Sequence, residues 1–301
     1  MRKLVLIHGR SQQNKNAVAL KKEWLESLNE GLSKSGLKLP IPESDVRLPY
    51  YGDTLIQMVD GQSSDAAAEI IVRGNPVDEA QNRFRIAVLQ EIASRAGLTD
   101  AQIAEASGDD EVLRRGVLNW AWMQAILTAM DRYVPFASGS SIALFTFDVY
   151  QYLKNSNIRA HIDEGVSSAF TPGIESVVVS HSLGTVVAYN CLVQRGHLLG
   201  WKTPLFVTLG SPLAVKEIKK SMASLAPMRC PQCAGNWLNA LDPRDVVALY
   251  PLDKEEFPIH PDIPSIENLL DVKNSTENRH GIAGYLTDKR VAKRIHDALI
   301  S

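Results

Sequence analysis

Short apolar runs separated by longer amphipathic stretches dominate the chain. The clearest runs cover residues 4–7, 176–179, 205–209 and 236–241, and each is bounded by Gly, Pro or Ser. A run of this length and composition is typical of a parallel strand that is buried on both faces. The pattern therefore predicts central strands at these positions.

Helical patterns alternate with the strands. Residues 17–32 follow the first run, residues 185–195 follow the second, and an amphipathic helix over 288–299 closes the chain. Weaker strand candidates cover 45–49 and 269–273. Because βαβ units require this alternation, we expect an α/β fold with a mostly parallel central sheet flanked by helices.

The middle of the chain is mostly helical, and we expect a helical insertion at about residues 54–145 within a single domain over 1–301. One segment has two apolar helix faces, formed by Val117, Trp120, Met123, Leu127 and Met130 and by Trp122, Ile126, Ala129 and Tyr133. A helix that is apolar on most sides is usually buried, so it is expected to pack on the sheet. A mobile lid or cap is the alternative interpretation.

Composition excludes several classes of protein. With 45% hydrophobic and 22% charged residues among 301, the chain is ordinary globular material and not disordered or fibrous. The 32 basic and 34 acidic residues are scattered, which argues against a nucleic-acid partner.

Localisation is predicted from what the sequence lacks. Its 3 cysteines give no secreted disulfide framework, and the apolar run near the start is too short for a signal peptide. The stretch 118–130 falls short of the ~20 residues that cross a bilayer. A soluble, cytoplasmic protein without a transmembrane segment is expected.

The sharpest local motif is Ser180-His181-Ser182-Leu183-Gly184, which lies between a strand and a helix. A tight turn of this kind needs small residues beside the central serine, so that the backbone can fold sharply and lift one hydroxyl above the sheet edge. The motif resembles the nucleophile elbow of the α/β-hydrolase superfamily of lipase-like and esterase-like serine hydrolases, with Ser180 in place of the usual first glycine. The resemblance implies that Ser182 is the nucleophile.

A second motif is similar to the same family. The first strand ends in His8-Gly9-Arg10, as in many α/β-hydrolases, which implies that the backbone N–H groups of Arg10 and Leu183 form the oxyanion hole. His8 is expected to orient this loop by hydrogen bonding and to take no part in the chemistry. Since this strand opens the chain, the resemblance also implies a sheet without the N-terminal edge strands of larger relatives.

A serine hydroxyl needs a base, and 7 histidines compete for that role. The family places its base on the loop before the last helix, which is where His280 lies, whereas His181 is expected beside the elbow with its ring turned away from Ser182. The acid should follow the run 236–241, where Asp245 is favoured and Asp242 remains an alternative that also reads as a turn opener. The order Ser182, Asp245, His280 is that of the α/β-hydrolases.

The predicted function is hydrolysis of a carboxylic ester through an acyl-enzyme, with a hydrophobic small-molecule acyl ester as substrate and with no cofactor and no metal. Cys230 and Cys233 offer only two of the four ligands that structural zinc needs, so a surface loop with two thiols is expected there. An acyltransferase or thioesterase on the same triad and a non-catalytic interaction module that retains the fold are the alternatives. Acyl chain length and oligomeric state are not predicted.

Overall fold

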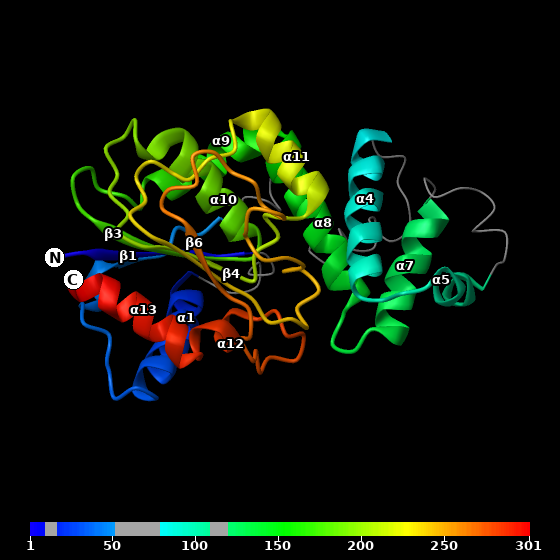
Figure 1. Cartoon of the computed structure of the whole chain (residues 1–301), viewed down its shortest axis with the longest axis horizontal. Coiled ribbons are helices and arrows are strands. Elements are labelled where there is room, and N and C mark those ends of the chain that lie inside the picture. Colours follow the sequence, from blue (N-terminus) through cyan, green and yellow to red (C-terminus); the bar gives the residue numbers. More distant parts are fainter. Residues whose placement is uncertain (10–16, 52–78, 109–119) are drawn as a thin grey trace.

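A single all-parallel sheet forms the centre of the molecule. The computed structural model describes residues 1–9, 17–51, 79–108 and 120–301. Six strands lie in the order β2-β1-β3-β4-β5-β6. They are β1 (Lys3–Ile7), β2 (Val46–Arg47), β3 (Ser176–His181), β4 (Phe206–Leu209), β5 (Trp237–Ala240) and β6 (Ile266–Leu269). Every neighbouring pair is parallel, so the fold is α/β, with helices on both faces of the sheet (Figure 1).

The described helices form two layers and an outer group. In chain order they are α1 (Ala17–Ser33), α4 (Glu79–Arg95), α5 (Asp100–Ser107), α7 (Trp120–Tyr133), α8 (Gly139–Lys154), α9 (Ser156–Ser167), α10 (Leu183–Cys191), α11 (Lys216–Leu225), α12 (Ile282–Leu286) and α13 (Lys289–Ile300). Helices α1, α12 and α13 cover one face, and α9, α10 and α11 lie on the other (Figure 1). Helices α4, α5 and α7 lie beyond α8, away from the sheet.

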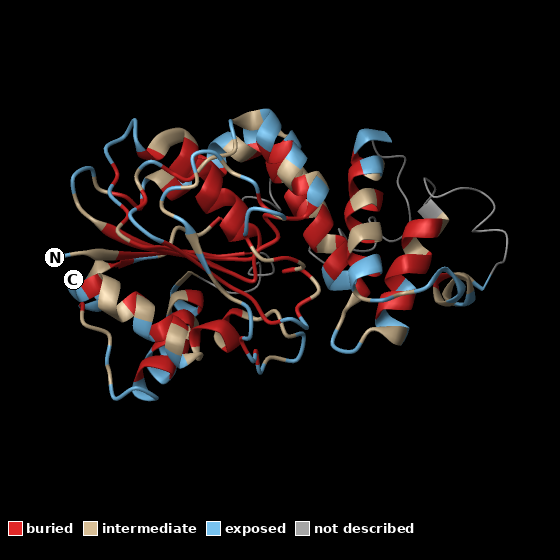
Figure 2. Ribbon diagram, in the orientation of Figure 1, coloured by how far each residue is buried: buried red, intermediate tan, exposed pale blue. Residues whose placement is uncertain are grey.

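The side chains of each strand point alternately to the two faces of the sheet and so contribute to two separate hydrophobic cores. On β1, Leu4 and Leu6 pack with α1, α12 and α13, while Val5 and Ile7 face the opposite core, which continues into the outer helices. Successive side chains of a strand point to opposite faces, so a run that is apolar throughout buries both. Figure 2 shows the resulting buried sheet between its helical layers.

Sheet topology marks one position for a ligand site. Strand β1 pairs with β2 on one side, and the next strand along the chain, β3, pairs with β1 on its other side. Loops at the carboxyl ends of β1 and β3 therefore diverge, and in open α/β sheets ligands bind in the crevice at such a switch point. Gly9 and Ser182 follow the ends of these two strands.

Most sequence-predicted strands are confirmed, but the last one was placed wrongly. The expected strand at 269–273 is instead β6, Ile266–Leu269, on the sheet edge. Its centre is polar, and the Asn268 amide is used in hydrogen bonds to Leu252 and Asn239. An edge strand needs no continuous apolar run, so periodicity favoured the wrong residues.

The apolar helix expected in the insertion is buried, but it packs mainly on other helices. Helix α7 lies against α4, α5 and α8, with Met123 and Ile126 almost inaccessible. The Trp120 side chain, Val117 and the stretches 54–78 and 109–119 lie outside the described residues. Helix α8 crosses residue 145, where the insertion was predicted to end. Within the described ranges, no helix is long and apolar enough to cross a lipid bilayer.

Two helical glycines are expected to respond in opposite ways to a methyl group. A Cβ at Gly31 in α1 would lie 2.2 Å from the Leu286 carbonyl oxygen, whereas one at Gly165 in α9 would have no neighbour within 4 Å. Gly31→Ala should lower the free energy of unfolding by about 1–3 kcal/mol through overpacking. Gly165→Ala should raise it by about 0.5–1 kcal/mol, because alanine loses less backbone entropy.

Urea unfolding of the two variants beside the wild type checks this pair. Equal effects of the two substitutions would contradict the close approach of α1 to the last residue of α12.

Candidate active site

Ser182 occupies the sharp turn between β3 and α10. Its backbone has φ 55° and ψ −130°, a left-handed conformation that is rare for a residue with a side chain. The Ser182 N–H donates to the Leu209 carbonyl oxygen at 3.1 Å, and the Thr185 hydroxyl donates to the Ser182 carbonyl oxygen at 2.8 Å. These bonds hold the strained turn on neighbouring strand ends.

Small residues around the turn are required by close backbone approach. A Cβ at Gly184 would lie 2.3 Å from the Ile7 carbonyl oxygen, and one at Gly9 would lie 2.7 Å from the Ser182 Cβ. At Ser180 the extra hydroxyl is accommodated, because it donates to the Val207 carbonyl oxygen at 2.8 Å. The turn thus fits tightly against the end of β1.

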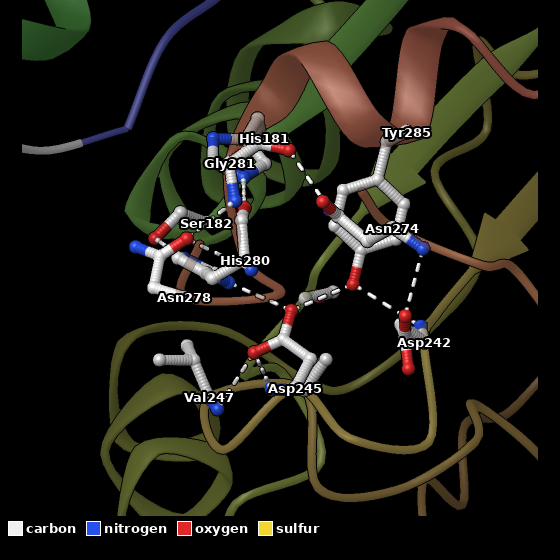
Figure 3. Close-up of polar contacts among 12 residues, drawn as sticks. His181, Ser182, Asp242, Asp245, Val247, Asn274, Asn278, His280, Gly281 and Tyr285 are labelled. Carbon is white, nitrogen blue, oxygen red and sulfur yellow. Dashed lines mark hydrogen bonds and ion pairs between the residues drawn. The ribbon is translucent and has the colours of Figure 1, made fainter. Parts of the chain in front are cut away.

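Ser182, His280 and Asp245 form one chain of hydrogen bonds (Figure 3). The distance from His280 Nε2 to Ser182 Oγ is 2.8 Å, and that from His280 Nδ1 to Asp245 Oδ2 is 2.7 Å. With Nδ1–H donating to the carboxylate, Nε2 is left to accept the serine proton. The three predicted residues, 35 to 98 positions apart in sequence, are brought together at the carboxyl edge of the sheet.

The Asp245 carboxylate is fully enclosed and richly hydrogen-bonded. Oδ1 accepts from the Val247 N–H at 2.8 Å and the Ala248 N–H at 3.3 Å, and Oδ2 also accepts from the Tyr285 hydroxyl at 2.6 Å. Burial alone would raise the pKa of Asp245, but the charge of His280 and these hydrogen bonds outweigh it and hold the pKa below its ordinary value. The carboxylate therefore stays ionised beside the imidazole.

Asp242 contacts Arg244 and the base-bearing loop and not the imidazole. Its Oδ2 lies 2.6 Å from Arg244 Nη2 and accepts from the Asn274 N–H at 2.7 Å. Burial opposes ionisation, but the Arg244 hydrogen bonds and charge lower the pKa of Asp242 overall. The Asp242 backbone N–H donates to the Tyr285 hydroxyl oxygen at 3.2 Å, so Tyr285 links the two aspartates.

The loop that carries His280 is fixed by side chains that the sequence did not single out. The buried Asn274 amide donates to the Gly281 carbonyl oxygen at 2.9 Å, and Asn278 Oδ1 accepts from the His280 N–H at 3.1 Å. His181 Nε2–H donates to the His280 carbonyl oxygen at 2.7 Å. Burial, followed by the charge of His280, lowers the pKa of His181 to about 3, so this ring is neutral at neutral pH.

These supporting residues were missed for identifiable reasons. Tyr285 lies in an apolar helix and reads as a core residue, and its hydroxyl contacts depend on chain segments 40 or more positions away. The polar run from Asn274 to Asn278 beside His280 was a usable signal, since clustered Asn and Thr side chains favour hydrogen-bonded turns.

The first strand end is also held by hydrogen bonds. His8 Nδ1–H donates to the Gly9 carbonyl oxygen at 2.6 Å, while Nε2 accepts from the Tyr51 N–H at 3.1 Å. Burial lowers the pKa of His8 to about 4, against the opposing Gly9 hydrogen bond, so the ring is neutral. This agrees with an orienting role for His8.

Of the two predicted oxyanion donors, only Leu183 lies within the described residues. Arg10 lies outside the described residues. Leu183 is the first residue of α10, where a backbone N–H has no partner within the helix.

A cavity of about 220 Å³ opens onto the Ser182 hydroxyl. Its walls come from the α7–α8 loop, from α8, from the loop after β5 and from the His280 loop. Apolar side chains form much of the lining, namely Phe136, Ile142, Phe145, Val246, Val247 and Ile282, with Ser138, Ser141 and Asn278 among the polar ones. The site can therefore hold a largely apolar group against an activated hydroxyl.

Among the residues that the structure describes, no group of three or more His, Cys, Asp or Glu side chains is placed to hold a metal ion. Cys230 and Cys233 are free thiols on the loop between α11 and β5, as expected, but Cys230 is buried within it. Burial raises the pKa of both thiols to about 11.

Comparison with known proteins adds no relative: no protein-family model, no curated protein and no solved structure matches this chain. Functional inference therefore depends on the geometry of the site alone.

Tyr285→Phe should destabilise the protein in a pH-dependent way. The folded-state pKa of Asp245 lies below its ordinary value of about 3.9, so ionised Asp245 stabilises the fold above that pH, and the contribution is lost as the pH falls through the folded pKa. Removing the hydroxyl should lower the free energy of unfolding by about 1–3 kcal/mol at neutral pH, and the difference should shrink below about pH 4. Urea unfolding at a series of pH values measures it.

Tyr189→Phe is the matched control. The Tyr189 hydroxyl donates to the Arg229 carbonyl oxygen at 2.9 Å, a neutral partner, so that loss should not vary with pH over the same range. A pH-independent loss in both variants would contradict the assigned role of Tyr285.

Proposed function

We propose that the protein is a serine hydrolase of the α/β-hydrolase fold that cleaves hydrophobic carboxylic esters through an acyl-enzyme. The observation that carries the proposal is the hydrogen-bond chain from Ser182 through His280 to Asp245, at 2.8 and 2.7 Å. A nucleophile, a base within reach of its proton and a buried acid that orients the base are the parts that acyl transfer needs.

The surrounding fold supports this assignment. Ser182 lies on a strained strand-to-helix turn at the carboxyl edge of a parallel sheet, beside the switch point between β1 and β3. The chain order serine, aspartate, histidine is that of the α/β-hydrolases. A purely structural serine would not require a left-handed backbone.

In the proposed mechanism, Ser182 Oγ attacks the ester carbonyl carbon while its proton passes to His280 Nε2. The imidazolium that forms is stabilised by the Asp245 carboxylate, which stays ionised. Collapse of the tetrahedral intermediate breaks the bond to the leaving alkoxide, and His280 returns the proton to it. Water then gives a proton to His280 and attacks the acyl carbon. The bond to Ser182 Oγ breaks, and His280 returns the proton to Oγ as the acid leaves.

Charge that develops on the carbonyl oxygen needs donors that are already in place. The Leu183 N–H, at the positive end of α10, is one such donor in this proposal. Arg10 keeps its predicted role as the second donor through its backbone N–H. The apolar lining of the cavity favours an ester with a hydrophobic group over a charged substrate.

Covalent labelling tests the nucleophile directly. A fluorophosphonate probe should label the wild type at Ser182, because it reacts with a hydroxyl whose proton a base can take. Ser182→Ala should lose the label and lower kcat for ester hydrolysis by about 10⁶-fold. Mass spectrometry of the labelled peptide identifies the site.

Ser180→Ala is the control, since the Ser180 hydroxyl faces the Val207 carbonyl oxygen inside the sheet. It should keep the label. A well-folded wild type that is not labelled would contradict the hydrolase proposal and favour a non-catalytic binding protein.

Two nearby aspartates allow a matched test of the acid. Asp245→Asn should lower kcat by about 10⁴-fold, because the amide no longer supports the imidazolium or selects its tautomer. Asp242→Asn should instead lower the free energy of unfolding by about 1–3 kcal/mol and change kcat by less than about tenfold, because Asp242 holds Arg244 and the Asn274 N–H. Steady-state kinetics and urea unfolding separate them, and the reverse pattern would identify Asp242 as the acid.

A further inference from the structure

Two cavities share one wall beside the candidate nucleophile. The Ser182 cavity, of about 220 Å³, and a neighbouring cavity of about 590 Å³ are both lined by Phe136 and Val246. A volume of 220 Å³ is below the roughly 300–1,000 Å³ typical of small-molecule sites, whereas 590 Å³ lies within that range. The first cavity is therefore small for a whole ligand, and the second has the volume of one.

Phe136 is held in an unusual conformation at this wall. It lies in the loop between α7 and α8, has φ 68° and keeps 46% of its surface exposed. A bulky residue with positive φ stores strain and is rare outside functional positions. This conformation places Phe136 in the lining of both cavities.

The ring is held from the opposite side by the His280 loop. The Arg279 guanidinium carbon lies 4.2 Å from the centre of the Phe136 ring, and Arg279 Nη1 donates to the Asn274 carbonyl oxygen at 2.9 Å. Arg279 also has a left-handed backbone, with φ 55°. This cation–π contact connects the wall to the residue that precedes the candidate base.

The second cavity is suited to an apolar chain. Its lining includes Ala96, Val134, Leu241, Leu249, Pro251 and Leu270. Its charged residues already have partners: Arg244 pairs with Asp242 at 2.6 Å, and Arg95 donates to the Leu249 carbonyl oxygen at 3.0 Å. Asp245, which also lines this cavity, accepts from the His280 ring and the Tyr285 hydroxyl. Because these charges are engaged within the protein, the cavity favours hydrocarbon over an anionic group.

We infer that the second cavity is a subsite for the distal part of an elongated apolar acyl chain, and that Phe136 is the partition past which this chain extends from Ser182. The inference depends on the proposed function for the identity of the reacting group. Binding in the subsite does not depend on turnover, so the two can be tested separately. Long-chain acyl esters are then the substrate class.

Filling the second cavity from its far wall tests the inference without turnover. In the Ser182→Ala protein, calorimetry measures the Kd of the dodecanoyl ester of methylumbelliferone. Adding Ala96→Trp, which places an indole in the second cavity only, should weaken binding by at least about tenfold, because the chain loses its apolar contacts. Adding Ala101→Trp, on the exposed start of α5 and lining neither cavity, should leave the Kd unchanged.

Opening the partition gives a second measurement that does not depend on whether Ala96→Trp folds. With Ser182 intact, Phe136→Ala should raise the ratio of kcat/KM for the dodecanoyl ester over the butanoyl ester by about tenfold. A dodecanoyl ester that does not bind, or that binds equally to the folded Ala96→Trp and Ala101→Trp proteins, would overturn the subsite. Loss of fluorophosphonate labelling with intact dodecanoyl binding would instead overturn only the proposed function.

Discussion

Burial of one ionised carboxylate organises the candidate site. The Asp245 side chain has no exposed surface, and an unpaired charge in such a place would be strongly destabilising. Its oxygens therefore need several donors, which come from the His280 ring, the Tyr285 hydroxyl and two backbone N–H groups after β5. Hydrogen bonds to this one charge fix the imidazole, α12 and the loop after β5 relative to one another.

The sheet supplies the second fixed point. Parallel strands bring their carboxyl ends to one edge, so Ser182 after β3 and the Asp245 loop after β5 lie on the same side of the molecule. Gly9 and Gly184 let β1 and the start of α10 approach without a Cβ between them. The position of Ser182 is thus set by backbone packing, whereas His280 is set by side-chain hydrogen bonds.

This division explains what could be predicted from the sequence. Strands that are buried on both faces have continuous apolar runs, which the sequence shows directly. The serine turn, the acid loop and the late histidine follow in a recognisable order, so Ser182, Asp245 and His280 could be predicted from the sequence. The edge strand β6 has a polar centre and gives no such run. Tyr285 and Asn274 act through hydrogen bonds to residues that are distant in sequence or separated by a turn, and no local pattern encodes those contacts. The sequence favoured Asp245 but left Asp242 open, because the two lie three residues apart; only the contact of Asp245 with the His280 ring distinguishes them.

The His280 loop contacts both the proposed catalytic residues and the wall of the proposed subsite. One residue of this loop contacts Ser182 and Asp245, while the residue before it holds Phe136 at the wall between the two cavities. Asn274 and His181 hold this loop by hydrogen bonds to the carbonyl oxygens of Gly281 and His280. Because the His181 ring is neutral at neutral pH, it adds no charge beside the His280 imidazole. A substrate chain that displaced Phe136 would act on Arg279, next to the base, so chain binding and the orientation of His280 share one short segment of backbone.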